Sequence, residues 1–555
     1  MRNRQVKLSF FLFCFLMTLL PQLLTAQLNQ GGVPQSFTIS LPPDDRKMVS
    51  LTPPIREILD QEDQRSPVPF RFAVNLPVDI DIEHSGNMVK TEDGTMVWRI
   101  TINAPGALAL TLYFDRFQLP PEGRFFVYSP DRTQLLGAFT SLNNNELNTF
   151  ATALINGDRI TLEYNFPDGS VLPQFHLSEV AYAYRGVPDK REDRTGFGAA
   201  GKCEVNVSCS EGSGWQQQVR SVARLEVKRG SSSVWCSGSL VNNTRNDGTP
   251  YLLTADHCGR LSTPEDLSRW LVYFNYQGTA CPNPLKEPVP RTMTGVKLIA
   301  HGGDGGNTGS DFYLARLLSA VPDTFNVYYN GWSRDTVPSP SGVSLHHPEG
   351  DIKKISTYTS PLIRANWNSQ PRYTHWKVTW AGTLHGHGTT EGGSSGSPLF
   401  NNLGLLVGTL TGGDSSCDSA NLSKPDYYGM FYYHWDRNGA DSASVLKYWL
   451  DPINSNVMNC NGWALGVKEP GIPAQVNIFP NPVRDEVTLR FSSDRAPHRQ
   501  ELRITDIRGT TIWSGVWDPA SETEKRISLS GWATGIYILI ISDGESRVVR
   551  KIIKL

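Results

Sequence analysis

The chain has no strong excess of charge of either sign, and this absence excludes one large class of function. Its 555 residues carry 52 Lys+Arg against 54 Asp+Glu, which gives a formal net charge of −2. A protein dedicated to binding nucleic acid needs a basic excess to neutralise the phosphates. We therefore expect no nucleic-acid partner.

Long hydrophobic runs are also missing. The one strongly apolar run covers residues 8–20, whereas a membrane-spanning helix needs about 20 residues. Basic residues precede this run, and Ala26 follows it as a small residue at a cleavage position. This pattern is typical of a signal peptide over residues 1–26 and predicts a protein that is secreted or held at the cell surface.

Cysteine is scarce, and none of it forms a C-x-x-C pair, which disfavours a zinc site. Cys14 lies in the signal peptide, and Cys460 stands apart from the others. In an exported chain, clustered cysteines indicate disulfides, but their spacing alone does not select the pairing. We expect disulfides, no metal and no cofactor. The clustered residues are Cys203, Cys209, Cys236, Cys258, Cys281 and Cys417.

The distribution of alternating segments predicts a mainly β protein. Its length suggests about three domains beyond the signal peptide. Residues 27–197 and 476–555 show short alternating strands with Pro and Gly turns, which are typical of β-sandwiches. Residues 198–463 carry the cysteines and are also mostly β, and residues 464–475 are a Gly/Pro linker.

Three short segments carry candidate catalytic residues, and each is weak evidence when taken alone. Ser395 lies in a glycine-rich turn, where the amides of Gly393 and Ser395 can form an oxyanion hole. His257 follows an apolar strand, and Asp311 opens another. Such residues are more often an ordinary loop serine, a structural histidine and a turn cap.

The order His257, Asp311, Ser395 is far more specific than any of the three segments. A serine nucleophile needs an imidazole base, and a carboxylate must fix the tautomer of that base. This order is that of the double-barrel serine proteases, whereas α/β-hydrolases and subtilisins have other orders. Ser395 is not the centre of a G-x-S-x-G motif like that of the hydrolases, because Ser397 stands in place of the second glycine.

Further motifs make the chain resemble the bacterial lysyl endopeptidases, which are secreted trypsin-fold serine proteases. The resemblance covers about residues 198–455. It implies a double β-barrel with Ser395 as nucleophile, His257 as base and Asp311 as the orienting carboxylate. The matching segments are residues 236–244, 253–255, 257–259, 273–277, 346–348 and 449–452.

The same resemblance implies a disulfide pairing and a substrate pocket. The pairs would be Cys203–Cys417, Cys209–Cys281 and Cys236–Cys258. Asp426, nine residues beyond Cys417, stands where the family has the aspartate of its S1 pocket. Such a buried carboxylate would select protein or peptide substrates with Lys or Arg at P1, because an unpaired buried charge is costly. Without the resemblance, Asp426 is a turn residue that follows proline.

Two positions depart from the family pattern. Asp256 stands where the family often has a second histidine beside the base. Trp367 matches an aromatic residue near the catalytic histidine and is expected to contact substrate, but Thr411 occupies the position of its partner histidine. We expect these departures to affect the rate and the pH optimum, not the reaction.

The last part of the chain resembles the C-terminal sorting domain of the type IX secretion system. The resemblance implies a β-sandwich, residues 476–555, that the outer-membrane export machinery recognises. The alternative is an ordinary accessory β-domain. The matching segments are residues 478–482, 506–509, 533–537 and 551–554.

Together these features predict a secreted, monomeric zymogen: signal peptide, β-rich propeptide, trypsin-like protease and sorting domain. The reaction would be peptide hydrolysis after lysine, with arginine as the alternative, through an acyl-enzyme. A catalytically inactive surface binding protein with a protease fold is the main rival. A metal hydrolase using His385, His387, His346 and His347 is disfavoured, because these loop histidines lack nearby carboxylates.

Overall fold

The structure is a computed structural model that describes most of the chain. The described residues are 29–41, 47–66, 69–185, 196–368, 372–418, 420–464, 476–491, 499–506, 510–518, 521–542 and 547–555. The predicted signal peptide, nearly all of the predicted linker and the basic residues Lys190, Arg191 and Arg194 lie outside them. Two compact units divide between residues 465 and 466, and each is described by itself.

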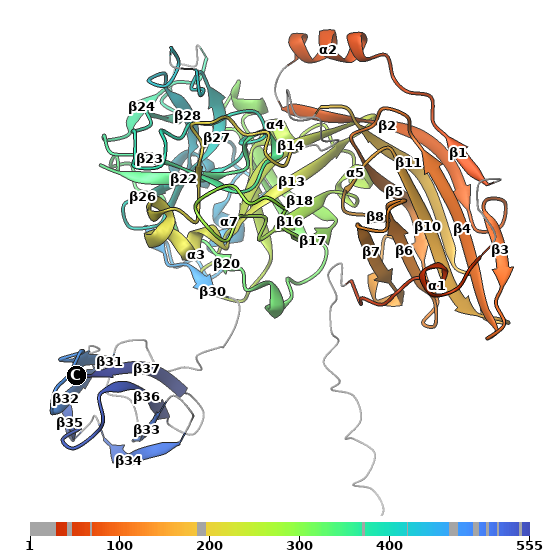
Figure 1. Cartoon of the computed structure of the whole chain (residues 1–555). Coiled ribbons are helices and arrows are strands. Elements are labelled where there is room, and N and C mark those ends of the chain that lie inside the picture. Colours follow the sequence, from red (N-terminus) through yellow and green to blue (C-terminus); the bar gives the residue numbers. More distant parts are fainter. Residues whose placement is uncertain are drawn as a thin grey trace, which may run out of the picture. The chain divides into compact units, whose positions relative to one another are not determined.

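Residues 29–185 form a β-sandwich at the N-terminal end of the first unit (Figure 1). One sheet has the order β1-β4-β10-β6-β7, with β3 on β4. The opposite sheet has the order β2-β11-β5-β8, with β9 on β5. Apolar side chains such as Trp98, Phe114 and Phe175 fill the space between the sheets. The elements are α1 (Gln35–Thr38), β1 (Met48–Ser50), α2 (Arg56–Arg65), β2 (Phe70–Asp81), β3 (Asn87–Lys90), β4 (Thr95–Asn103), β5 (Ala109–Gln118), β6 (Arg124–Tyr128), β7 (Leu135–Phe139), η1 (Ser141–Asn143), β8 (Phe150–Ala151), β9 (Ile155–Asn156), β10 (Arg159–Pro167) and β11 (Gln174–Ala183).

The next strands form the first β-barrel of a trypsin-like pair. They run in the order β17-β16-β13-β14-β15-β19-β18, and β17 leads directly into β18, which closes the barrel. The interior is apolar and includes Leu225, Val272 and Leu252. The elements are η2 (Ser210–Trp215), α3 (Gln216–Val219), β13 (Val222–Arg229), β14 (Ser232–Leu240), β15 (Tyr251–Thr254), α4 (Asp256–Gly259), α5 (Pro264–Leu267), β16 (Leu271–Phe274), β17 (Arg291–Thr294), β18 (Val296–Gly302), η3 (Asp304–Gly306), β19 (Phe312–Leu317) and η4 (Asp323–Phe325).

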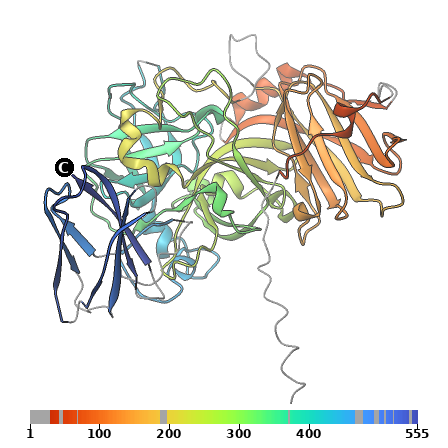
Figure 2. The same cartoon turned by 60° about the horizontal axis from the view of Figure 1, so that its bottom comes forward.

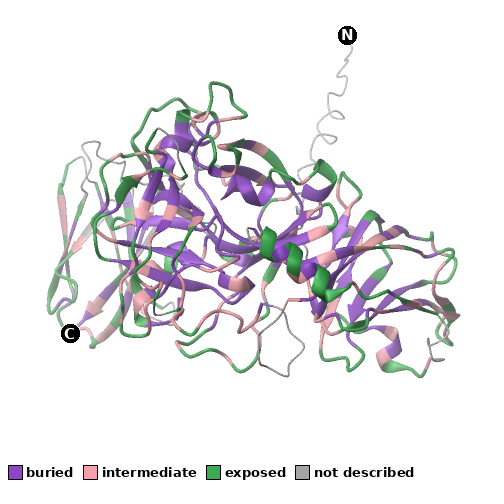
Figure 3. Ribbon diagram, turned by 90° about the horizontal axis from the view of Figure 1, so that it is seen from above, coloured by how far each residue is buried: buried purple, intermediate pink, exposed green. Residues whose placement is uncertain are grey.

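The second barrel has the strand order β12-β23-β22-β26-β27-β28-β25-β24, with β21 bridging β27 and β29. In both barrels the buried residues follow the strands, whereas exposed residues gather in the loops (Figure 3). The elements are β12 (Val205–Asn206), β20 (Tyr328–Tyr329), β21 (Trp332–Ser333), β22 (Gly342–His346), η5 (Pro348–Gly350), β23 (Lys354–Tyr358), β24 (Ile363–Ala365), β25 (His375–Val378), β26 (Pro398–Asn401), β27 (Leu406–Gly413), β28 (Asp426–Met430), α6 (Phe431–Asp436), α7 (Lys447–Leu450), β29 (Asn459–Cys460) and β30 (Trp463–Ala464).

The N-terminal sandwich and the first barrel share one continuous sheet, which the sequence did not predict. Strand β2 pairs antiparallel with the first half of β14, with Ala73 opposite Ser233. The ring of Phe72 stacks on that of Trp235 at 3.8 Å. Residues on both sides of position 197 therefore belong to one compact unit.

Residues 476–555 form a second β-sandwich with its own apolar core, which includes Leu489, Ile504 and Leu539. It appears in dark blue in Figure 2. One sheet has the order β31-β32-β35 and the other β34-β33-β36-β37. No helix among the described residues is long and apolar enough to cross a membrane. The strands are β31 (Val476–Phe479), β32 (Glu486–Phe491), β33 (Gln500–Asp506), β34 (Thr511–Trp517), β35 (Glu524–Ser528), β36 (Gly535–Ser542) and β37 (Arg547–Lys554).

Candidate active site

His257 and Asp311 form a buried pair in the first barrel. His257 lies in α4, directly after β15, and Asp311 precedes β19, which pairs with β15. Asp311 Oδ2 lies 2.7 Å from His257 Nδ1, and its Oδ1 accepts the backbone N–H of His257 at 2.9 Å. Asp311 adopts a left-handed backbone (φ 58°), which aspartate tolerates better than most residues. The carboxylate thus holds both the ring and the backbone of the histidine.

The electrostatics of this pair favour an ionised aspartate. Asp311 is fully buried. Burial alone would raise its pKa, but the charge and the hydrogen bonds of His257 outweigh burial, and the pKa is lowered. His257 Nε2 is buried and has no hydrogen-bond partner among the described atoms. The second ring nitrogen therefore remains available to exchange a proton.

Ser395 belongs to the turn before β26, and the first barrel holds this turn in place. The Ser395 carbonyl accepts the backbone N–H of Ser237 at 2.8 Å, and Cys258 Sγ lies 3.8 Å from the same oxygen. At Gly396 a Cβ would come within 2.0 Å of Thr254 Oγ1, so only glycine fits there. Ser395 is therefore brought beside the segment that carries His257.

The backbone of Gly393 requires glycine. Its φ is +88°, and a Cβ there would lie 2.9 Å from the carbonyl oxygen of His347. Its own carbonyl accepts the hydroxyl of Ser237 at 3.0 Å. The amides of Gly393 and Ser395, which the sequence predicts as oxyanion donors, belong to this turn.

Asp426 opens β28 and is fully buried among uncharged donors. Its Oδ2 accepts hydrogen bonds from three side chains, and its Oδ1 accepts the backbone N–H of Ser415 at 3.3 Å. Burial raises the pKa of Asp426, although the bonds from Ser415, Trp380 and Thr390 lower it in part. A Cβ at Gly413 would come within 2.1 Å of Oδ1, so this approach also requires glycine. The three side-chain donors are Ser415 Oγ at 2.6 Å, Trp380 Nε1 at 2.6 Å and Thr390 Oγ1 at 2.8 Å.

Trp367 is half-buried and packs edge-on against Tyr427 with 5.6 Å between ring centroids. It also lies beside Gly412, next to Thr411. Thr411 Oγ1 bonds with Nε2 of His375 in β25, whose ring centroid is 6.1 Å from that of Trp367. A histidine therefore does approach this site, from a strand that the local sequence around Thr411 could not reveal. Burial lowers the pKa of His375 to about 4.

Asp256 has a role that sequence reasoning missed. Its Oδ1 lies 2.8 Å from His301 Nδ1, and its Oδ2 accepts the backbone N–H of Gly305 at 2.8 Å. The hydrogen bond with Asp256 raises the pKa of His301. The carboxylate thus anchors the loop between β18 and Asp311. Only its position beside His257 could have drawn attention to it.

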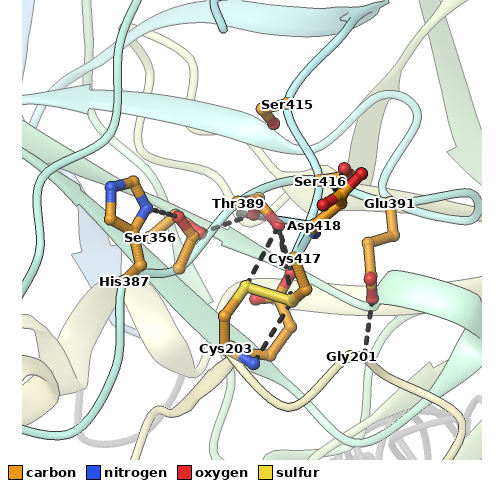
Figure 4. Close-up of a disulfide and its surroundings, with 12 residues drawn as sticks. Gly201, Cys203, Ser356, His387, Thr389, Glu391, Ser415, Ser416, Cys417 and Asp418 are labelled. Carbon is orange, nitrogen blue, oxygen red and sulfur yellow. Dashed lines mark hydrogen bonds between the residues drawn. A yellow bond between two sulfur atoms is a disulfide. The ribbon is translucent and has the colours of Figure 1, made fainter. Parts of the chain in front are cut away.

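The structure joins Cys203 to Cys417, Cys209 to Cys281 and Cys236 to Cys258, which is the pairing that the resemblance implies. The last of these links β14 to the helix that carries His257. Thr389 and Glu391 surround the Cys203–Cys417 bridge (Figure 4). Cys460 is buried and free, and burial raises the pKa of its thiol to about 11.

The histidines of the metal-hydrolase alternative have separate partners. The expectation that no carboxylate lies near them is wrong, because His385 Nδ1 lies 2.8 Å from Glu211 Oε2 and His346 Nε2 lies 3.8 Å from Glu204 Oε2. His387 Nδ1 lies 3.0 Å from the Gly388 carbonyl. Both nitrogens of His346 face serine hydroxyls. Among the described residues, these histidines therefore bond to separate protein groups and do not converge on one metal position.

Comparison with known proteins identifies two segments. Residues 197–429 match the family "Lysyl endopeptidase, C-terminal domain", and residues 477–555 match the family "Secretion system C-terminal sorting domain". A lysyl endopeptidase from Pseudomonas aeruginosa is 27% identical over 362 residues, which cover 62% of this chain and 74% of that protein.

Among solved structures, the protease Anisep from Arthrobacter nicotinovorans is 16% identical, with a TM-score of 0.26, and covers 38% of this chain and 90% of its own. The human heparin binding protein is 15% identical, with a TM-score of 0.29, and covers 43% of this chain and 94% of its own.

Proposed function

We propose that this secreted serine endopeptidase hydrolyses peptide bonds on the carboxyl side of lysine, through an acyl-enzyme formed on Ser395. Its protease segment is of the lysyl endopeptidase type. The observation that carries the mechanism is the His257–Asp311 pair at 2.7 Å, whose second ring nitrogen is unpartnered beside the segment of Ser395.

In the first half of the reaction, Ser395 Oγ attacks the scissile carbonyl carbon and His257 Nε2 takes its proton. Asp311 keeps the proton on Nδ1 and stabilises the imidazolium. The carbonyl oxygen becomes an oxyanion that accepts hydrogen bonds from the backbone N–H groups of Gly393 and Ser395. The C–N bond then breaks as His257 returns the proton to the leaving amine, and the acyl-enzyme remains.

In the second half, a water molecule replaces the amine. His257 takes a proton from this water as it attacks the ester carbon, and the same amides bind the second oxyanion. The bond to Ser395 Oγ breaks, and His257 gives its proton to the serine. The products are a free amine and a carboxylic acid, and the enzyme is restored without a cofactor.

We further propose that Asp426 forms the base of the S1 pocket. Three donors occupy its Oδ2, and one long bond reaches Oδ1, so essentially one oxygen remains for a ligand. A lysine ammonium needs one such acceptor, whereas a guanidinium binds best when its fork meets two oxygens. This difference supports a preference for lysine over arginine at P1.

The N-terminal domain, residues 27–197, is proposed to be a propeptide that is removed from the active enzyme. Strand β2 of this domain begins beside the turn that carries Ser395. A Cβ built at Gly392 would come within 2.4 Å of Phe70 Cδ2, at the start of that strand. The domain therefore reaches the region of the oxyanion hole. N-terminal sequencing of fully active enzyme tests this proposal, and a start at Gln27 would contradict it.

Residues 476–555 are proposed to be recognised by outer-membrane export machinery. In a host with that machinery, a chain truncated after residue 475 should be made but retained inside the cell. The same truncation should keep its peptidase activity after cell lysis, which separates a sorting role from a catalytic one.

Ser395→Ala tests the proposed reaction directly. The variant should lose hydrolysis by about 10⁴–10⁶-fold in kcat while it remains folded, because the nucleophile is absent. Ser416→Ala, in the loop beside Asp426, is a matched control that should retain activity. Activity of Ser395→Ala within tenfold of the parent would remove Ser395 from the mechanism.

A fluorophosphonate probe separates the proposal from an inactive binding protein with the same fold. The probe should label the parent enzyme at Ser395 and leave Ser395→Ala unlabelled, whereas an inactive protein would not react. Digestion of a peptide library, read by mass spectrometry, then gives the P1 preference.

A further inference from the structure

The His346–His347–Pro348 segment belongs to neither the triad nor the proposed pocket. It lies at the end of β22 and the start of η5. Both histidine side chains are fully buried, and His346 Nδ1 lies 2.9 Å from the hydroxyl of Ser394, the residue before the proposed nucleophile. A buried histidine in direct contact with this turn needs an explanation.

The hydrogen bonds of His346 determine which of its nitrogens carries the proton. Ser356 donates its only hydroxyl proton to the Thr389 carbonyl at 2.6 Å (Figure 4). Ser356 must therefore accept from His346 Nε2–H, at 2.9 Å. In the neutral ring Nδ1 is then the acceptor, and Ser394 donates its hydroxyl to it. Burial lowers the pKa of His346 to about 3, so the ring is neutral near neutral pH.

The residues that follow His346 hold the preceding part of the turn. The His347 N–H donates to Ser237 Oγ at 3.0 Å, and Ser237 Oγ donates to the Gly393 carbonyl. The Glu349 N–H donates to the Gly392 carbonyl. Residues 346–349 thus hold Gly392, Gly393 and Ser394 of the turn, with Ser237 as the link to Gly393.

These bonds set the direction of the proposed oxyanion donors. In a trans peptide the C=O and the next N–H point in opposite directions. A bond to the Gly392 carbonyl therefore aims the amide of Gly393. The Ser394 carbonyl accepts the N–H of Ser397 at 2.9 Å, which likewise aims the amide of Ser395. The side chain of Ser394, held by His346, fixes the residue between the two donors.

We infer that His346 is a positioning residue for the oxyanion hole: its neutral imidazole holds Ser394 so that the amides of Gly393 and Ser395 converge. This inference rests on the proposed peptidase function. The bonds in this arrangement join an imidazole to hydroxyls, and Glu204 Oε2 lies 3.8 Å from His346 Nε2, the nitrogen remote from Ser394. Misplacement of preorganised groups by about 1 Å can slow a reaction by about 10²-fold.

The test compares His346→Leu with His346→Gln in the full-length chain. Leucine removes both hydrogen bonds, whereas glutamine keeps one acceptor and one donor. Removal of one oxyanion donor costs about 10²–10³ in kcat, so we expect His346→Leu to lose about 10–100-fold in kcat with KM within about twofold. His346→Gln should recover part of this loss. Tyr358→Phe, which deletes a buried hydroxyl bonded to the Phe400 carbonyl, is the matched control with unchanged kcat.

A second readout separates positioning from a general loss of structure. A peptide aldehyde with a P1 lysine forms a tetrahedral adduct that needs the oxyanion donors, whereas the product acid with the same sequence does not. His346→Leu should weaken binding of the aldehyde in proportion to the loss in kcat and leave binding of the acid unchanged. Equal weakening of both ligands would overturn the positioning role.

A double-mutant cycle completes the test. Ser394→Ala deletes the hydroxyl that donates to His346 and that accepts the Glu391 N–H at 3.3 Å. It serves as the probe if His346→Leu does not fold. Because one bond joins the two side chains, the loss in the double variant should be smaller than the sum of the two single losses. Additive losses, or a kcat loss below threefold in His346→Leu, would overturn the inference. Ser395→Ala tests the proposed function independently of this inference.

Discussion

Two fully buried aspartates lie in the two barrels, and the protein compensates their charges differently. Asp311, in the first barrel, faces a histidine that can carry a positive charge. Asp426, in the second, faces three side-chain donors and one amide, all uncharged. Burial raises the pKa of Asp426, whereas at Asp311 the interaction with His257 overcomes burial and lowers the pKa.

In the proposed mechanism, this difference assigns Asp311 to the reaction that all substrates share and Asp426 to the choice among substrates. The charge of Asp311 is complemented inside the protein, so its contribution should be the same for every substrate. The charge of Asp426 is stabilised only by dipoles, so a cation from the substrate improves its environment. We therefore expect variants of Asp311 to affect all substrates equally and variants of Asp426 to affect cationic ones.

The largest effect is expected for Asp311→Asn. The amide would place an N–H against His257 Nδ1 and favour the wrong tautomer, which costs about 10⁴ in kcat in a triad of this kind. We expect equal proportional losses of kcat/KM for matched Lys, Arg and Ala substrates, with folding checked by chemical denaturation. A loss that depends on the P1 residue would break the proposed contrast between the two aspartates.

Asp426→Ser should produce the second-largest effect, and a selective one. Losing one partner of a desolvated charge pair costs about 2–5 kcal/mol, or roughly 30–4,000-fold in kcat/KM for Lys substrates. The Ala substrate should change little. If all three substrates lost activity equally, Asp426 would be a structural turn residue and the pocket assignment would fail.

The sequence was sufficient to propose the triad because its signals are local. A glycine-flanked serine, a histidine beside a cysteine and an aspartate at a strand start can each be read from a few neighbours. Their order along the chain then narrows the fold. The disulfide pairing came only through resemblance, because spacing alone does not determine it.

The surroundings of Asp426 could not be predicted in the same way. Its donors Trp380, Thr390 and Ser415 come from three segments that meet only when the second barrel closes. The same limit applies to His375, which reaches Thr411 from another strand. The pairing of β2 with β14 is a contact between residues far apart in sequence, and neither strand's own pattern specifies it.

As the pH is lowered, Asp426 should become protonated before Asp311. The pKa of Asp426 is raised in the free enzyme, and a bound lysine would lower it, so protons compete with lysine. As pH falls through the free-enzyme pKa, the ratio of kcat/KM for Lys over Ala substrates should drop by up to about tenfold per pH unit. The ratio cancels the protonation of the catalytic base, which both substrates share.

The control for this pH experiment is Asp426→Ser, whose Lys:Ala ratio should be independent of pH. Asp311 stays ionised in the same range because its pKa is lowered, so it cannot produce the effect. A constant ratio in the parent enzyme down to the pH at which it unfolds would mean that Asp426 does not meet the substrate cation.

The smallest expected effect is the most specific to the proposed lysine preference. Ser415→Ala removes the hydroxyl bond to Asp426 Oδ2 at 2.6 Å but keeps the backbone N–H that reaches Oδ1. An acceptor position on Oδ2 then becomes free, and the carboxylate can meet a guanidinium with both oxygens. The Lys:Arg ratio of kcat/KM should therefore fall, by about 2–10-fold for the change of one hydrogen bond. Thr390→Val, which removes another donor to the same oxygen, is the matched comparison and should shift the ratio in the same direction. An unchanged ratio in both variants would mean that the number of free carboxylate oxygens does not set the preference, and that the length of the pocket must do so.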